Sequence, residues 1–311
     1  MAATKPAMTL SKIESLWFAD GTLVLQAENT IFRVYPGLLA TASPVFKDML
    51  AFPQPHDGPK YEGCPLVQLH DSASDVAHFL KAIIFYNYFE PWPADVTFFV
   101  MSAVLRLSSK YQVEPLRRRA LVLFSKGFPI TPQAFGEDKW ELDPMVIAKL
   151  AREANADWIL PIALSYCALA EPEQLLNSPL NPSDTLLCLR ARDRIQNYWA
   201  ARMLSFLWTP LHIPGCSTSR VCSIRRIEQR KNSEAARMNR VPILKLWGHR
   251  DWEKVEDVCG ACMRFMMSSF RENRQAFWED LPNMFGLPEW ATLIETRAKA
   301  MAGTDDDDPD E

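Results

Sequence analysis

The residues with the clearest chemical potential are four cysteines in the last third of the chain: Cys216, Cys222, Cys259 and Cys262. Only two residues separate Cys259 from Cys262, a spacing that lets both sulfurs face one metal ion. Four thiolates arranged as a tetrahedron form a closed structural zinc site. The gap between Cys216 and Cys222 is wider than usual, and His212 and His249 are spare ligand candidates. A structural zinc ion is therefore the only cofactor that the sequence indicates.

Two other interpretations of these cysteines stay open. Cysteine is often a small buried apolar residue with no chemical role. A redox-active pair at Cys259 and Cys262 is disfavoured, because the surrounding strand–helix–strand pattern is missing. The seven cysteines in total are an odd number and no secretory signal precedes them, which favours thiols or metal ligands over a disulfide framework.

Enzyme motifs are absent from the sequence. None of the five histidines has a recognisable Ser-His-Asp or Cys-His context. There is no phosphate-binding glycine loop and no His-Glu-x-x-His pair. We therefore predict a protein without catalytic activity of its own.

Net charge and hydropathy argue against two further classes of protein, nucleic-acid binders and membrane-spanning proteins. The chain of 311 residues has a net charge of −4, which argues against a dedicated nucleic-acid binder. A basic stretch over residues 220–240 contains Glu228 and Glu234 and lacks interleaved aromatics, so a solvated helix is favoured over a phosphate-tracking surface. No apolar run reaches the roughly 18 residues that span a bilayer. The expected location is intracellular, in nucleus or cytoplasm, without membrane contact.

The cysteines belong to a region whose patterns are mainly helical. Residues 129–302 form the predicted helical C-terminal region, with helices expected over 184–207, 228–240, 251–279 and 289–301 and an irregular segment over 211–223. Residues 303–311 are predicted to be a disordered acidic tail. At the other end, residues 1–14 are predicted to be flexible and residues 15–128 to form a separate domain.

That N-terminal domain begins with strand patterns and continues with helical ones. Thr22–Ala27 and Thr30–Val34 predict a β-hairpin. Ser43 followed by Pro44 predicts the start of a helix. Strands first and helices later indicate an α+β fold, a small sheet capped by a helical bundle.

The order of short motifs in this domain resembles a BTB/POZ domain of the type found in many fungal proteins. The motifs are Trp17-Phe18-Ala19-Asp20-Gly21, Phe32-Arg33-Val34, Leu38-Leu39-Ala40, Ser43-Pro44-Val45-Phe46, Pro65 to Leu69 and Leu105 to Tyr111. The resemblance implies a protein–protein interaction module that forms a homo- or heterodimer and recruits partners. The positions that it assigns to the interaction surface are Trp17, Phe18, Asp20, Tyr35, Leu38 and Leu39.

Two features depart from the best-known uses of this family. Tyr35 stands where a histidine is common in co-repressor-binding pockets. Met49-Leu50-Ala51 lacks the glutamate with which related adaptors contact a cullin-type ubiquitin-ligase scaffold. The alternatives to a general interaction module are therefore a cullin adaptor and a nucleic-acid-associated transcriptional regulator.

Overall fold

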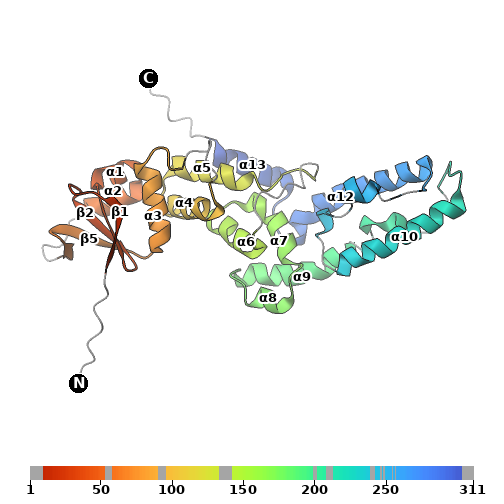
Figure 1. The fold of residues 1–311 in the computed structure, drawn as a ribbon, viewed down its shortest axis with the longest axis horizontal. Helices are drawn as coiled ribbons and strands as arrows, with labels where there is room; N and C mark the ends of the chain where they lie inside the picture. The colour runs from red at the N-terminus through yellow and green to blue at the C-terminus, as the bar shows by residue number, and fades with distance from the viewer. Residues whose placement is uncertain are drawn as a thin grey trace, which may run out of the picture. The chain divides into compact units, whose positions relative to one another are not determined.

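The computed structural model describes residues 10–52, 58–89, 96–132, 142–198, 202–207, 213–238, 242–245, 247, 249–253, 255 and 257–302 (Figure 1). The chain divides into two compact units. Unit 1 comprises Met1–Phe124 with Ala300–Glu311, and unit 2 comprises Ser125–Lys299. The main boundary therefore falls a few residues before the predicted one at 128/129. The predicted acidic tail, residues 303–311, lies outside the described residues.

Unit 1 contains a small mixed sheet. β2 (Leu23–Ala27) and β3 (Thr30–Val34) form the predicted antiparallel hairpin. β1 (Ser11–Trp17) pairs in parallel with β3, β5 (Cys64–Leu69) pairs in parallel with β2, and β4 (Lys60–Tyr61) pairs antiparallel with β5. The order is β1-β3-β2-β5-β4. Because β1 begins at Ser11, the prediction that residues up to 14 are flexible is wrong for residues 11–14. Residues 11–15 of β1 are mostly polar, so the sequence shows no strand pattern there. They are ordered because β1 pairs with β3.

In the described part of this unit, five helices follow or interrupt the strands: α1 (Pro36–Ala42), α2 (Pro44–Ala51), α3 (Ala73–Ile84), α4 (Phe98–Lys110) and α5 (Glu114–Ser125). Their buried faces follow the helical spacing of the sequence; Val76, Phe79 and Leu80 on α3 are examples. The predicted α+β class of this unit, strands first and helices later, is confirmed.

Ser43 connects three parts of unit 1. Its side chain accepts a hydrogen bond from the Phe46 amide at 3.0 Å and so caps α2, as predicted. The same hydroxyl donates to the Tyr111 carbonyl at the end of α4, at 2.5 Å. The Tyr111 ring stacks between Phe46 and Phe79, with centroid distances of 4.6 and 5.5 Å. A fully buried serine therefore ties the α1–α2 hairpin to α4.

Substituting Ser43→Ala is expected to lower the free energy of unfolding by about 2–3 kcal/mol. Loss of the cap accounts for about 1 kcal/mol, and the Tyr111 carbonyl left without its buried donor accounts for the rest. Ser72→Ala is the matched control, since Ser72 caps α3 through the Asp75 amide but is exposed. Chemical denaturation of the two variants measures the difference, and equal losses would contradict the second role of Ser43.

All the regular elements among the described residues of unit 2 are helices. Its elements are α6 (Pro144–Glu153), η2 (Asp157–Ile159), α7 (Leu160–Cys167), α8 (Pro172–Leu176), α9 (Pro182–Tyr198), η4 (Ser205–Leu207), α10 (Ser219–Met238), η5 (Ile243–Lys245), α11 (His249–Glu253), α12 (Gly260–Met284) and α13 (Trp290–Met301) up to Lys299. The apolar helix α7 is buried and contacts α6, α9 and α12. None of the described helices is both long and apolar enough to cross a bilayer.

Three predicted helix boundaries are wrong. The helix expected over 184–207 does not run to residue 207: α9 spans Pro182–Tyr198, and residues 205–207 form the separate 3-10 turn η4. The helix expected over 251–279 is divided, because α11 ends at Glu253 and α12 begins at Gly260. The segment expected to be irregular up to residue 223 becomes helical at Ser219, where α10 begins. This last correction matters for the cysteines, because it places Cys222 in the first turn of a helix.

Candidate metal centre

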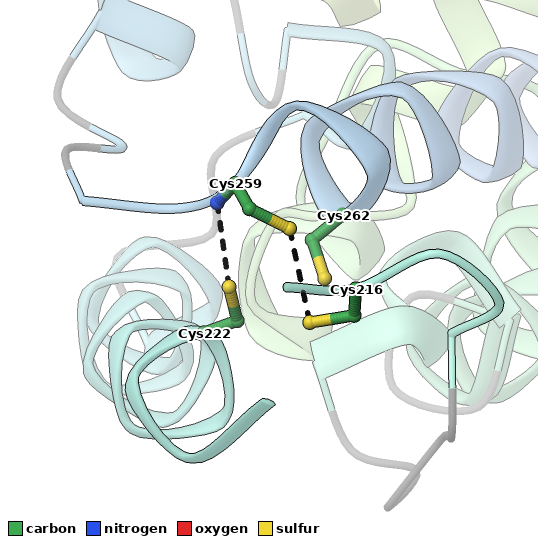
Figure 2. A group of neighbouring side chains, drawn as sticks. All are labelled: Cys216, Cys222, Cys259 and Cys262. Carbon is green, nitrogen blue, oxygen red and sulfur yellow. Dashed lines mark hydrogen bonds between the residues drawn. The ribbon is translucent and has the colours of Figure 1, made fainter. Parts of the chain in front are cut away.

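The structure brings the four predicted cysteines together in unit 2 (Figure 2). Their four sulfur atoms all lie within 4.8 Å of one another. The sulfurs of Cys216 and Cys259 are 3.7 Å apart. A tetrahedral zinc ion with Zn–S bonds of about 2.3 Å separates its sulfurs by about 3.8 Å. The cluster therefore has the size that a single tetrathiolate metal ion requires. It is the only group of three or more candidate ligands found among the described residues.

Two helix starts and one turn position the sulfurs. Cys259 is the N-cap residue of α12, and Cys262 lies in the first turn of that helix. Cys222 lies in the first turn of α10. Cys216 follows Gly215, which adopts a left-handed conformation with φ of +76° that glycine accommodates without strain. The wide spacing between Cys216 and Cys222 is bridged by this turn and the beginning of α10.

Backbone amides at these helix starts stabilise negative charge on the sulfurs. Hydrogen bonds from the amides of Cys262 and Ser217 lower the pKa of the Cys259 thiol to about 5. The Cys259 amide in turn donates to the Cys222 sulfur at 3.3 Å. By contrast, burial raises the pKa of the Cys262 thiol. The site therefore favours negative charge on the Cys259 sulfur.

Apolar residues pack against the cluster, which leaves Cys216 and Cys259 partly exposed. Cys222 and Cys262 are buried together with Ile213, and Val258 and Phe265 pack against them. The Thr218 hydroxyl lies 3.2 Å from the Cys222 sulfur. Sequence reasoning missed two hydrogen-bonding neighbours of the sulfurs: the Ser217 amide, which donates to Cys259, and the Thr218 hydroxyl, which shares a hydrogen bond with Cys222. Their position inside the Cys216–Cys222 gap was the available signal. Of the spare ligands, His212 and the side chain of His249 lie outside the described residues.

The residues predicted to form an interaction surface are only partly brought together in unit 1. Phe18 and Tyr35 are in ring contact with a centroid distance of 5.0 Å. The Tyr35 hydroxyl donates to Asp20 at 2.6 Å, and this bond lowers the pKa of the Asp20 carboxyl. Trp17 belongs to another group: its ring lies against Tyr61 and under the Lys12 ammonium.

The two leucines of α1 have opposite environments. Leu38 is 47% exposed, whereas Leu39 is fully buried. Leu39 therefore contributes to the core, which corrects its assignment to an interaction surface. Adjacent helical residues point about 100° apart, so the packing of α1 can bury one leucine and expose the other.

The basic stretch at 220–240 largely forms α10, and acidic partners occupy part of it. Arg225 pairs with Glu228 at 2.9 Å and with Asp257 at 2.6 Å. Arg226 is buried and donates to the Phe206 carbonyl. These pairings reduce the charge available for a nucleic-acid phosphate backbone. Arg240 and the side chain of Arg237 lie outside the described residues.

Comparisons with known proteins found no match to a family model, to a curated protein or to a solved structure. The side chains of this chain are therefore the basis for proposing its function.

Proposed function

We propose that this chain is a protein–protein interaction module without catalytic activity, which self-associates and recruits partners through unit 1. The order of elements supports it: a β-hairpin, a helical hairpin, a returning strand and three further helices follow one another as the resemblance to BTB/POZ domains implies. The observation that carries the proposal is the half-exposed Leu38 on α1, one turn after Tyr35, whose ring contacts Phe18. An exposed apolar side chain that follows partly exposed aromatic rings by one helical turn is typical of an interface.

The edge strand of the sheet offers a second surface for self-association. β1 is the outermost strand beyond β3 and carries the exposed charges of Lys12 and Glu14. Charged residues on an edge strand oppose indiscriminate pairing with other chains. A self-association that uses β1 would therefore be selective for a matching surface.

Substituting Leu38→Asp is expected to convert a dimer of the full chain into monomers, because the interface would have to bury a carboxylate without a partner. Multi-angle light scattering measures the mass. Leu186→Asp on α9 is the matched control, since Leu186 is 46% exposed and lies in unit 2. A wild-type chain that stays monomeric at high concentration, or a dimer that Leu38→Asp leaves unchanged, would contradict the proposal.

The second part of the proposal concerns the cysteine cluster, which we assign to a structural zinc ion. Four sulfurs within 4.8 Å, two helix starts that donate hydrogen bonds and apolar residues packed against the cluster support a closed site. Sulfur-only ligands favour zinc over the hard cations calcium and magnesium. Metal analysis of the protein purified without added metal tests the assignment: one zinc per chain is expected, and a metal-free folded protein would contradict it.

Two partner classes belong to the same proposal as alternatives. A cullin-type scaffold would dock near the end of α2, where Ala51 replaces the glutamate of the adaptors that this domain resembles. A nucleic-acid-associated role would use α10, and the pairs of Arg225 with Glu228 and Asp257 weaken it. DNA affinity that falls steeply with salt would favour the nucleic-acid alternative.

A further inference from the structure

The four sulfurs of the cysteine cluster differ in how far solvent reaches them. Cys222 and Cys262 are buried, each with an exposed fraction of 1%. Cys216 and Cys259 are only partly buried. A zinc ion holds all four sulfurs as thiolates, so accessibility becomes the property that decides which of them a dissolved oxidant attacks. Oxidation of the cluster therefore begins at Cys216 or Cys259.

The two partly exposed cysteines are also direct neighbours. Their sulfurs are 3.7 Å apart (Figure 2), and a disulfide bond is about 2.0 Å long. Cys216 follows the turn at Gly215, and Cys259 is the N-cap residue of α12. Neither residue lies inside a helix, where backbone hydrogen bonds on both sides would resist the approach of the two sulfurs.

We propose that the cluster is a redox switch, in which hydrogen peroxide oxidises Cys216 and Cys259 to a disulfide and thereby releases the metal ion. The inference rests on the structural zinc ion proposed above and adds how that site is regulated. Two sulfurs joined in a disulfide are no longer thiolate ligands, and Cys222 and Cys262 alone cannot complete a tetrathiolate tetrahedron. The pair differs from Cys259 and Cys262, whose two-residue spacing is common in redox-active pairs, because Cys262 is buried.

One molecule of hydrogen peroxide is consumed for each disulfide formed. An exposed thiolate attacks a peroxide oxygen, the O–O bond breaks, and hydroxide departs, which leaves the sulfur as a sulfenic acid. The second exposed thiolate attacks that sulfur, the S–O bond breaks, and a second hydroxide departs. Two electrons have then passed from the two sulfurs to the peroxide, and both hydroxides take up protons from the solvent to become water.

Oxidation changes which segments the site joins. The metal ion would connect the turn at Cys216, the start of α10 through Cys222, and the start of α12 through Cys259 and Cys262. The disulfide keeps Cys216 attached to the start of α12 but removes the metal bond to Cys222. Weaker contacts then hold Cys222, among them the hydrogen bond from the Cys259 amide and packing against Ile213. The beginning of α10 is therefore the part that the switch loosens.

A second pair of neighbouring cysteines provides an internal control. Cys167 at the end of α7 and Cys188 on α9 are hydrogen-bonded to each other and fully buried. That hydrogen bond, together with burial, raises the pKa of the Cys167 thiol. This pair has a neighbouring sulfur but neither solvent access nor thiolate character, so it is expected to stay reduced in peroxide.

Peroxide treatment of the zinc-loaded wild-type chain tests the switch. A chromogenic chelator follows the released zinc, and peptide mapping without reduction, after free thiols are alkylated in denaturant, identifies the disulfide. We expect loss of the bound zinc, one disulfide joining Cys216 to Cys259, and alkylated Cys167 and Cys188. Hydrogen exchange is expected to become faster at the start of α10 than at the start of α12. Reduction with zinc present is expected to restore the metal content.

Substituting Cys216→His separates disulfide formation from metal binding. Three cysteines and one histidine are an established ligand set for structural zinc, and histidine forms no disulfide. The variant is expected to keep its zinc under the peroxide exposure that empties the wild type. Cys64→Ala is the matched control, since it also removes one cysteine but lies outside the cluster, and it is expected to lose zinc as the wild type does. The wild-type peptide map decides the question if Cys216→His takes up no zinc.

The outcomes separate the switch from the zinc assignment. A reduced wild-type chain that folds without zinc would reject the structural zinc ion, and the switch with it. A zinc-loaded chain that keeps its metal in peroxide would overturn the switch alone. So would a chain that loses the metal with Cys259 joined to Cys262, or with sulfinic acids in place of a disulfide. A disulfide between Cys167 and Cys188 under the same exposure would overturn the role assigned to solvent access.

Discussion

Substituting Cys262→Ala is expected to remove the zinc ion and to melt the beginnings of α10 and α12. Cys262 is buried at the first turn of α12 and lies with Cys222 in one apolar cluster. Structural zinc sites contribute about 10–16 kcal/mol of apparent binding free energy near neutral pH. Without the fourth thiolate most of that contribution is lost, and the two helix starts are no longer joined. Metal content, far-UV circular dichroism and the melting temperature measure the effect.

A matched substitution separates metal binding from packing. Cys64→Ala removes a buried sulfur from the core of unit 1, where Cys64 packs with Val24 and Ile31 and is not one of the clustered cysteines. It is expected to cost about 1 kcal/mol and to leave the zinc content unchanged. A chelator should lower the melting temperature of the wild type and of Cys64→Ala, but not that of Cys262→Ala. If the cysteines only fill space, the two variants will lose similar stability and a chelator will change neither.

The second large effect is expected at the ion pair between α6 and α9. Asp184 is buried, and Arg152 donates two hydrogen bonds to its carboxylate, at 2.8 and 3.1 Å. Arg152→Met keeps the alkyl chain but leaves this buried carboxylate with Asn181 as its side-chain donor. Breaking a buried pair costs about 3–5 kcal/mol. We expect about 3 kcal/mol, because the Arg152 side chain is 32% exposed and Asn181 remains.

Lys149→Met is the control for that substitution. Lys149 lies on the same helix, α6, and pairs with Glu153 at 3.7 Å on the surface. An exposed pair of this kind contributes about 0.5 kcal/mol or less. Urea denaturation of the two variants gives the comparison. Similar stabilities for Arg152→Met and Lys149→Met would show that the buried carboxylate is neutralised in another way.

Interactions between near neighbours in the chain account for what could be predicted from the sequence. The hairpin over β2 and β3, the Ser43 cap before Pro44 and the pair Cys259–Cys262 each depend on residues a few positions apart. Backbone conformation and one hydrogen bond are enough to define them. For the same reason the α+β class of unit 1 and the helical character of unit 2 were predictable.

Contacts between distant segments were decided by the tertiary structure alone. Strand β1 has no strong apolar pattern and exists because β3 supplies its hydrogen-bond partners. Leu38 and Leu39 are the same residue type, and only the packing of α1 exposes one and buries the other. On α10 the apolar residues Val221, Ile224 and Ile227 are likewise exposed, because other residues of that helix are the ones buried.

The cysteine cluster combines both kinds of information. Residue type and the two-residue spacing of Cys259 and Cys262 were enough to predict a ligand pair. The meeting of Cys259 with Cys222 and Cys216, 37 and 43 residues earlier, required the start of α10 to pack against the start of α12. Sequence alone determined which side chains could bind a metal, because ligand chemistry belongs to the side chain. Only the folded chain decided that four sulfurs converge, because convergence depends on the packing of segments that are remote in sequence.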